Sequence, residues 1–328
     1  MKKILGIGSA LVDILIRLQD DAALVQLGLP KGSMQLVDQS QRDSILSVFE
    51  GFTKNLAAGG SAANTIHGIG KLGGPAGFIG IIGQDKLGDS FVNDMKNAGV
   101  EVHILRSPTP TGCATTLISP DSERTFATYL GASSELSPTH LETLRPIFAQ
   151  YDIFHIEGYL VFNQLLTEAA IKMAKEAGLL VSIDLASYNV VEANRDFLHR
   201  IVRDYVDIVF ANEEEARAFT GKEPEEALAD ISHLASWAIV KTGSKGSLIH
   251  HNGVTCRIGV IPVTPADTTG AGDLYASGFL YGMANGLTLQ QCGELGALLA
   301  GKVIEVMGAK MDEARWTEIK QTGQGLNS

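Results

Sequence analysis

The sequence predicts an α/β fold in which a doubly wound, mostly parallel sheet carries helices on both faces. Short runs rich in Ile, Val and Leu alternate with amphipathic stretches over most of the 328 residues. Near-continuous apolar runs are typical of strands buried on both faces of a parallel sheet. Strands that alternate with helices imply right-handed crossovers, which place helices on both faces of the sheet.

Six apolar runs are the predicted strands of this sheet. They are residues 3–9, 78–82, 153–157, 180–185, 206–211 and 237–241. Helical patterns lie between them, among them residues 164–176, with Gly178 as a C-cap, and residues 192–205. A hairpin is predicted over residues 248–257, because Asn252-Gly253 suits a type I′ turn.

Two regions, residues 11–38 and 100–130, interrupt this alternation. They contain strand-like segments without intervening helices, and residues 111–118 and 124–129 look like an antiparallel pair. We expect these pieces to form a small separate sheet, a lid that covers a site. No internal repeat or low-complexity linker divides the chain, so one domain over residues 1–328 is expected, with the lid inside it.

Composition limits the class of protein. Hydrophobic residues make up 45% of the chain, enough for a substantial core. The formal net charge is -11 and no basic block is present, which argues against nucleic acid or an anionic membrane as partner. Three cysteines without a C-x-x-C pair argue against a disulfide framework or a structural zinc site. No apolar run is long enough to span a bilayer, so we expect a soluble cytoplasmic protein.

Asp13 stands just past the first predicted strand, in an otherwise apolar segment. A carboxylate there should lie at a sheet edge or on a ligand, and its paired oxygens suit a vicinal diol such as that of ribose. A solvated turn residue is the alternative.

The turn Gly59-Gly60-Ser61-Ala62-Ala63-Asn64 precedes a predicted helix that runs to about Leu72. Gly59 and Gly60 can bring backbone N–H groups up to a ligand, and Asn64 can offer its amide. The alternative is an ordinary glycine turn with Ser61 as N-cap. The pattern Gly68-x-Gly70-x-x-Gly73 lies at the end of this helix, so it does not predict a dinucleotide site.

Two further motifs follow predicted strands, where ligands bind in open α/β sheets. Asn212 and Glu215 could order water around Mg²⁺, which keeps several waters when bound. Thr242 and Gly243 could hold a nucleotide phosphate. The alternatives are a helix start with acids in its first turn and a plain glycine turn.

The run Asp267-Thr268-Thr269-Gly270-Ala271-Gly272-Asp273 reads as a tight turn that opens a helix. Free N–H groups and the positive end of the helix dipole bind phosphate at such a place. A carboxylate beside bound phosphate fits Asp273 as the group that takes a proton from a hydroxyl during phosphoryl transfer. The alternative is an Asp that only complements the helix N-terminus.

The glycine turns and Asn212, Thr242 and Gly270 all stand near predicted strand ends, which converge on one crevice in a doubly wound sheet. No G-x-x-x-x-G-K-[ST], G-x-S-x-G or H-E-x-x-H motif is present. A dinucleotide-dependent oxidoreductase would suit the sheet, but its fingerprint is missing.

On these motifs the chain resembles the ribokinase-like (PfkB) family of carbohydrate and nucleoside kinases over essentially its whole length. Residues 59–74 resemble the family's N-terminal glycine signature, residues 267–273 its C-terminal signature, and Asn212 with Glu215 its N-x-x-E motif. The resemblance implies a three-layer α/β/α fold with a small β lid.

The resemblance also implies roles for residues at the matching positions. Asp273 would be the catalytic base that acts on a primary hydroxyl, and backbone N–H groups of the turn before it would form the anion hole for the γ-phosphoryl group. The anion-hole residues are Gly270, Ala271 and Gly272, and the ribose hydroxyls would be bound by Asp13, Gly59, Gly60 and Asn64.

The ATP side of the site follows from the same resemblance. Asn212 and Glu215 would arrange Mg²⁺ through water, and the ATP site would be lined by Asn212, Thr242 and Gly243. Arg124, in the lid hairpin, would approach the phosphate, for which a solvated strand cation is the alternative. Many relatives also have a K⁺ site near the anion hole, and family members occur as monomers and as homodimers.

Within the family the chain looks most like the adenosine kinases, which residues 6–14, 129–132 and 212–216 resemble; Ser9 departs from the Asn that they often carry. The implied reaction converts adenosine and ATP to AMP and ADP, a step of purine salvage. A free-sugar kinase of the ribose or fructose type is the alternative, and an adenine-sized apolar slot near Met34, Leu36 and Phe126 would separate the two. A regulator that has lost catalysis is the other alternative, against which the intact Asp273 argues.

Overall fold

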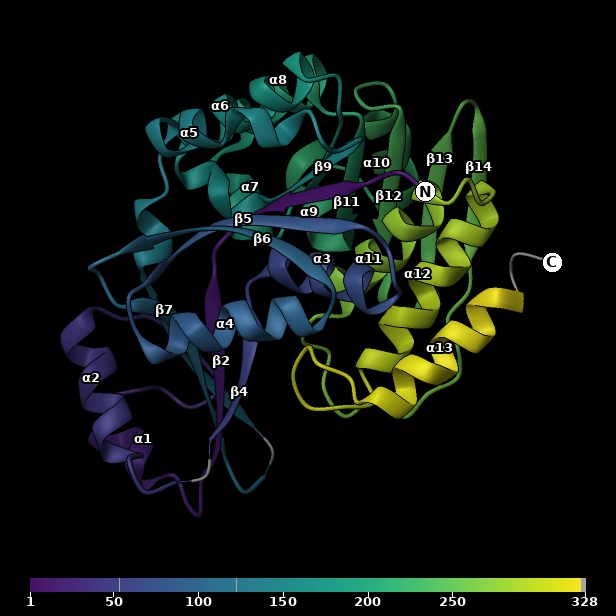
Figure 1. The fold of residues 1–328 in the computed structure, drawn as a ribbon. Coiled ribbons are helices and arrows are strands. Elements are labelled where there is room, and N and C mark those ends of the chain that lie inside the picture. The colour runs from purple at the N-terminus through teal and green to yellow at the C-terminus, as the bar shows by residue number, and fades with distance from the viewer. Residues whose placement is uncertain (53, 122, 326–328) are drawn as a thin grey trace.

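A nine-stranded sheet forms the centre of the computed structural model, which describes residues 1–52, 54–121 and 123–325 (Figure 1). Its strand order is β14-β13-β12-β11-β10-β9-β1-β5-β6, parallel except for β13 and β14. The strands are β1 (Ile4–Ile7), β5 (Ala76–Gly83), β6 (Val100–Ser107), β9 (Ile153–Glu157), β10 (Leu180–Asp184), β11 (Ile208–Asn212), β12 (Trp237–Lys241), β13 (Ser247–His251) and β14 (Val254–Ile258). All six predicted strands are therefore confirmed.

Helices cover both faces of this sheet, which gives the expected three layers (Figure 1). One face carries α5 (Pro138–Phe148), α6 (Gln164–Glu176), α7 (Tyr188–Ala193), α8 (Arg195–Tyr205), α9 (Glu213–Thr220) and α10 (Pro224–Ser232). The other carries α3 (Ser61–Lys71), α4 (Lys86–Asn97), α11 (Ala271–Ala284), α12 (Leu289–Val303) and α13 (Glu313–Gly325). Single turns of 3₁₀ helix are η1 (Ala132–Glu135), η2 (Gly158–Phe162) and η3 (Gly243–Lys245).

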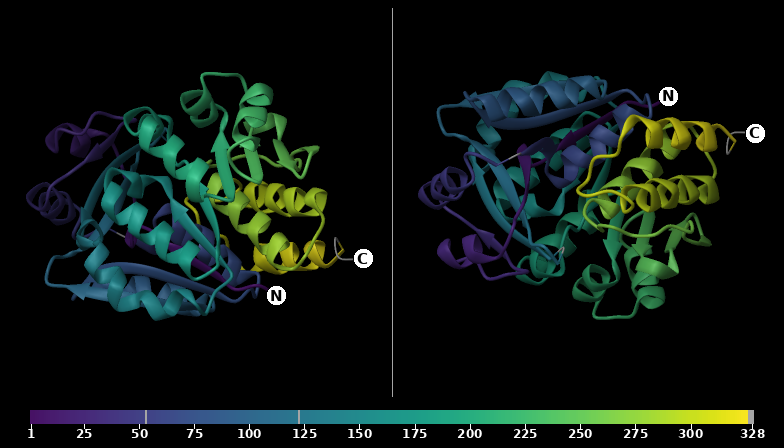
Figure 2. Two further views of the ribbon diagram at one scale, coloured as in Figure 1. Left: turned by 90° about the horizontal axis from the view of Figure 1, so that it is seen from above. Right: turned by 90° about the horizontal axis from the view of Figure 1, so that it is seen from below.

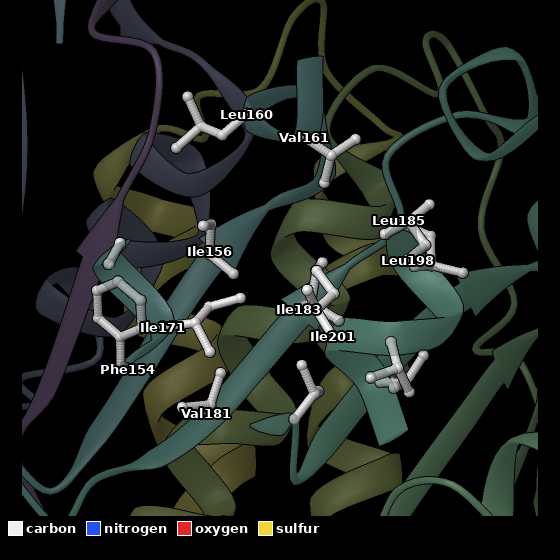
Figure 3. Close-up of a cluster of buried hydrophobic side chains, with 14 of the residues drawn as sticks. Phe154, Ile156, Leu160, Val161, Ile171, Val181, Ile183, Leu185, Leu198 and Ile201 are labelled. Atoms are coloured by element: carbon white, nitrogen blue, oxygen red, sulfur yellow. The ribbon is translucent and has the colours of Figure 1, made fainter. Parts of the chain in front are cut away.

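The core beneath α6 and α8 shows why these strands form. Phe154 and Ile156 of β9 lie beside Val181 and Ile183 of β10 and face Ile171 of α6 (Figure 3). Ile153 of β9 belongs instead to the core on the opposite face of the sheet. Because successive strand residues point to opposite faces, a strand that is covered on both sides is mostly apolar. The buried polar residues of this pair, His155 and Ser182, are hydrogen-bonded to each other at 3.0 Å.

Two local predictions are refined by the structure. The hairpin turns at Asn252 and Gly253, both with positive φ (48° and 76°), as a type I′ turn requires. The single helix expected over residues 192–205 is wrong, because α7 and α8 meet at Asn194. Asn194 has a non-helical φ of -129° and its side-chain amide donates to the Val190 carbonyl at 3.0 Å, which competes with the backbone bonds of a continuous helix.

The predicted lid is a second, five-stranded sheet with the order β3-β8-β7-β2-β4. Its elements are β2 (Leu11–Arg17), α1 (Ala22–Gln26), β3 (Met34–Leu36), α2 (Gln39–Val48), β4 (Asn55–Gly59), β7 (Thr111–Ile118) and β8 (Arg124–Gly131). The antiparallel pairing of β7 with β8 is confirmed. The lid lies on the side of the molecule opposite to both termini (Figures 1 and 2).

The predicted extent of the lid is partly wrong. β6 pairs in parallel with β5 and is the edge strand of the large sheet, although its residues fall in the range 100–130. β4 instead pairs with β2 inside the lid, and a short helix, α1, interrupts the range 11–38. Strand-like patterns do not identify the partner sheet, because pairing depends on elements distant in the chain. Among the described residues, no helix is long and apolar enough to cross a membrane.

Candidate active site

A cavity of about 910 Å³ opens between the lid and the carboxyl ends of the large sheet's strands. Four of its lining residues are the last residues of neighbouring strands: Glu157 of β9, Asp184 of β10, Asn212 of β11 and Lys241 of β12. The N-terminus of α11, the lid strands β2, β7 and β8, and η2 also contribute to the wall. The crevice expected from the strand-end motifs is therefore a real cavity.

Asp273 lies at the cavity wall in the first turn of α11, which begins after Gly270. Gly270 has a φ of 76°, a backbone conformation that turns the chain sharply into the helix and favours glycine. The Asp273 carboxylate accepts hydrogen bonds from Ser61 Oγ (2.7 Å) and Asn64 Nδ2 (3.0 Å), both in the first turn of α3. Two helix N-termini therefore meet at this carboxylate.

Burial raises the pKa of Asp273 to about 6, while the bonds from Ser61 and Asn64 oppose the rise. Asp184 raises the pKa further and Lys241 lowers it. The carboxylate is thus mostly ionised at neutral pH yet far more basic than an exposed Asp, as a general base requires.

Asp13 of β2 lines the same cavity. A Cβ on Gly59, in the paired strand β4, would lie 2.2 Å from Asp13 Oδ1, so glycine there leaves room for the carboxylate. Within the described part of the chain, the Asp13 carboxylate accepts no hydrogen bond. Burial raises the pKa of Asp13 to about 6, Lys310 lowers it and Asp273 raises it. Its acceptor oxygens are available to a ligand.

Glu157, which is 1% exposed, holds together the backbone segments at the floor of the cavity. Its carboxylate accepts from the backbone N–H of Ser9 (2.8 Å) and of Ala62 (2.9 Å), which ties β9 to the loop after β1 and to the start of α3. Burial raises the pKa of Glu157, and the two backbone bonds oppose the rise. Sequence analysis missed this residue, although an acid at the end of a buried, mostly apolar strand was a usable signal.

Asn212 and Glu215 form a capping box at the start of α9 and also line the cavity. Asn212 N and Nδ2 donate to the two Glu215 oxygens at 2.8 and 2.6 Å, and Glu215 N donates to Asn212 Oδ1 at 2.9 Å. Burial raises the pKa of Glu215 to about 7, and Lys241 opposes this. The helix start is confirmed, and the Mg²⁺ role of the two residues stays a prediction.

The donor set fits a magnesium ion held through water. Among the described residues, no group of three or more His, Cys, Asp or Glu side chains is arranged to hold a metal directly. Glu215 is 2% exposed, so its negative charge is costly to bury. A hydrated cation beside it would reduce that cost.

Arg124 joins the lid to the turn that precedes α11. Its guanidinium pairs with Asp267 and donates to Thr269 Oγ1 at 2.6 Å. Asp267 also accepts from the backbone N–H of Thr269 and of Gly308, each at 2.7 Å. The lid strand β8 is therefore anchored beside the glycine turn.

Most predicted site residues lie on the cavity wall. Those that line it are Asp13, Gly60, Asn64, Arg124, Asn212, Glu215, Gly270, Gly272 and Asp273. Gly59, Ala271, Thr242 and Gly243 do not appear among the lining residues. Thr242 is 5% exposed and follows Lys241, whose side chain reaches the wall in its place.

The lid and η2 give this cavity an apolar side. Leu36 and Phe126 line it, as the slot hypothesis expected, while the side chain of Met34 lies outside the described residues. Phe162 of η2 also lines it, and Leu36 and Phe162 are each 66% exposed. Large apolar side chains left open at a cavity mouth favour an apolar ligand surface there.

A buried carboxylate of raised pKa in the first turn of a helix, facing a cavity between two sheets, suits a phosphotransferase that acts on an alcohol group. The chain belongs to the pfkB family of carbohydrate kinases, whose model matches residues 34–315. Members of this family are kinases, and the chain is a kinase that uses ATP.

Relatives in this family include kinases for nucleosides and for sugars. A solved adenosine kinase from Sinorhizobium meliloti is 34% identical, with a TM-score of 0.85 over 98% of this chain and 99% of that one. A probable sugar kinase from Rhizobium etli CFN 42 is 33% identical, with a TM-score of 0.86 over 99% of both chains. The adenosine kinase of Saccharomyces cerevisiae is 26% identical over 309 residues, covering 87% of this chain and 90% of its own.

Proposed function

We propose that the protein transfers the γ-phosphoryl group of ATP to a primary hydroxyl of a ribose-containing substrate, adenosine, to give AMP and ADP. The observation that carries the proposal is the Asp273 carboxylate, held by Ser61 and Asn64 at the start of α11. It would take the hydroxyl proton as the oxygen attacks the γ-phosphorus. Backbone N–H groups of Gly270, Ala271 and Gly272 would hold the transferred group, because the first N–H groups of a helix have no partner within it. The Ala271 N–H donates to the Thr268 carbonyl at 3.2 Å and would have to exchange that bond for the phosphoryl group.

The two sides of the cavity support a nucleoside. Asp13 and Asn64 offer polar atoms to ribose hydroxyls, and the buried Asn64 Oδ1 has no hydrogen-bond partner among the described residues. Leu36, Phe126 and Phe162 offer an apolar wall to a planar base. A free monosaccharide would leave that wall uncovered, whereas adenosine carries both a sugar and a base.

The ATP side rests on the strand ends β11 and β12. Asn212, Thr242 and Gly243 are proposed to line it, and Asn212 with Glu215 to hold Mg²⁺ through water. Bound magnesium would neutralise phosphate charge. Arg124, bound to Thr269 beside the glycine turn, is proposed to approach the phosphate when the lid closes. Exclusion of water by the lid would protect the phosphoryl group from hydrolysis.

A free-sugar kinase of the ribose or fructose type is the second candidate. It is favoured by the probable sugar kinase that is 33% identical to this chain, and by the polar atoms of Asp13 and Asn64, which suit any vicinal diol. We rank it second because a free sugar would leave the apolar wall of the cavity uncovered.

The test is ADP release from ATP and Mg²⁺ with adenosine, inosine, ribose, fructose or no acceptor. Adenosine-dependent turnover well above the others is the expected result, and would place the protein in purine salvage. Turnover with a free sugar alone would keep the reaction and overturn the substrate. Silence with every acceptor, together with tight ATP binding, would favour a non-catalytic nucleotide-binding role.

A further inference from the structure

Lys241 is a buried cation at the turn that begins α11. It is the last residue of β12, and its side chain is 14% exposed. A Cβ placed on Gly272 would lie 3.0 Å from Lys241 Nζ, so the ammonium group stands directly against one of the proposed anion-hole glycines. Both residues line the cavity together with Asp273.

Asp184 holds this ammonium group in place. Its Oδ2 accepts from Lys241 Nζ at 2.7 Å, while Oδ1 accepts from the backbone N–H of Ala186 at 3.0 Å. Ala186 has a φ of 67°, which costs a non-glycine residue free energy and is characteristic of functional sites. The carboxylate is therefore fixed at both oxygens, and its side chain is 7% exposed.

The geometry leaves two protons of the ammonium group for a ligand. An ammonium has three donors, and Asp184 is the only acceptor that Lys241 contacts among the described residues. Burial lowers the pKa of Lys241, but the charges of Asp184 and Glu215 outweigh it, and the pKa is raised overall. The side chain is thus a permanent cation in the cavity.

The charge of the cavity makes such a cation necessary. Six acids line it, namely Asp13, Glu157, Asp184, Glu215, Asp267 and Asp273. A triphosphate that enters would be repelled by ionised carboxylates. Arg124, the other lining cation, is occupied by Asp267 and Thr269.

We propose that Lys241 is a catalytic residue that donates hydrogen bonds to the transferred phosphoryl group, and that Asp184 positions it. The inference rests on the proposed phosphoryl transfer. In that step a bond forms between the acceptor oxygen and the γ-phosphorus, and the bond from the γ-phosphorus to the β–γ bridging oxygen breaks. That oxygen leaves with the electron pair on ADP, and the acceptor's proton passes to Asp273. Lys241 would neutralise charge on the oxygens of the moving group.

The test uses a charge-neutral double variant, because Lys241→Met alone would leave Asp184 buried and unpaired. Lys241→Met with Asp184→Asn removes one charge of each sign. The matched control is Lys175→Met with Asp207→Asn, since Lys175 Nζ of α6 pairs at 2.8 Å with Asp207, the residue before β11, and neither residue lines the cavity. Thermal unfolding of both variants checks the fold.

Two readouts follow for each variant. We expect kcat of the Lys241–Asp184 variant to fall about 10²- to 10³-fold, the loss typical for one donor to a transition-state anion, with the acceptor KM within about threefold. A kcat within about threefold of the control would overturn the proposal, because a structural pair tolerates neutral replacement.

The second readout does not depend on the acceptor. Calorimetry compares the affinity of the protein for ADP with its affinity for the non-hydrolysable imido analogue of ATP. Wild type and control are expected to prefer the triphosphate, and the Lys241–Asp184 variant is expected to lose that preference. A preference retained in the variant, or absent from wild type, would overturn the role of Lys241. If no acceptor is phosphorylated, the proposed function fails while this measurement still decides on Lys241.

Discussion

Ser61 donates a 2.7 Å hydrogen bond to Asp273, a residue 212 positions further along the chain. The bond joins the first turn of α3 to the first turn of α11, and Asn64 adds a second bond at 3.0 Å. Thr65 Oγ1 donates to the Asp273 carbonyl at 3.1 Å, so side chain and backbone are both held. The candidate base therefore has one orientation, set by two helices that the fold packs together.

Asp273→Asn should lower kcat by about 10²- to 10⁴-fold, because an amide cannot accept the hydroxyl proton. Steady-state ADP release measures the loss, and circular dichroism checks the fold. Asp196→Asn is the matched control, an exposed Asp in the first turn of α8. Wild-type turnover in Asp273→Asn would remove the base assignment.

Ser61→Ala should shift the pH dependence of kcat/KM. In wild type the acid limb should lie near pH 6, since Asp273 must lose its proton and burial raises its pKa to about 6. The Ser61 bond lowers that pKa, so its loss should move the limb to higher pH and spare activity at alkaline pH. Ser277→Ala is the control, because Ser277 lies on α11 with Asp273 and its Oγ has no partner among the described residues. An acid limb that stays at the wild-type pH would show that the Ser61 hydrogen bond does not lower the pKa of Asp273.

Asp13→Asn should weaken acceptor binding and stabilise the fold at neutral pH. The raised pKa of Asp13, about 6 against an ordinary 3.8, means that the folded state binds more protons between those values than the unfolded state. Wild-type stability is thus lost as pH rises through that window. The variant avoids this cost, on the order of 1–3 kcal/mol at pH 7.5, and should show no gain at pH 4. Urea unfolding at both pH values and acceptor KM measure the two effects; an unchanged KM would count against a diol contact.

Arg124→Met should loosen the lid, because the pairing with Asp267 and the 2.6 Å bond to Thr269 are lost. We expect kcat to fall about tenfold and hydrolysis of ATP without acceptor to rise, since an open lid admits water. Arg17→Met, an exposed arginine at the end of lid strand β2, is the control. Equal behaviour of the two variants would show that the anchor has no part in closure.

Removal of Mg²⁺ with a chelator should abolish turnover. Glu215→Gln should raise the Mg²⁺ concentration needed for half-maximal activity by roughly tenfold, which is within the range seen when groups that orient metal ligands are lost. Glutamine can still accept from Asn212 N, but its NH₂ group cannot accept the second bond, from Asn212 Nδ2. Glu214→Gln, an exposed acid in the same first turn, is the control. The same titration in K⁺ and in Na⁺ tests the expected potassium dependence. An identical Mg²⁺ response in both variants would show that Glu215 has no part in Mg²⁺ binding.

Much of the secondary structure was predictable from short segments of the sequence. The apolar runs of β9 and β12 marked strands buried on both faces, and Asn252-Gly253 marked a turn that needs two positive φ angles. The glycine turn at residues 267–273 placed Asp273 in a first helical turn. Each of these signals lies within a few residues of chain, where periodicity and steric preference act.

Tertiary structure decided the rest. Asp184 and Lys241 were visible at predicted strand ends, but their ion pair exists because β10 and β12 flank β11, and strand order is not written in either segment. Glu157 gains its role only where β9 meets the start of α3. The sequence by itself determined which segments are strands, turns and helix starts. The packing of distant segments decided which charges are buried together, because burial and pairing depend on neighbours that local sequence does not name.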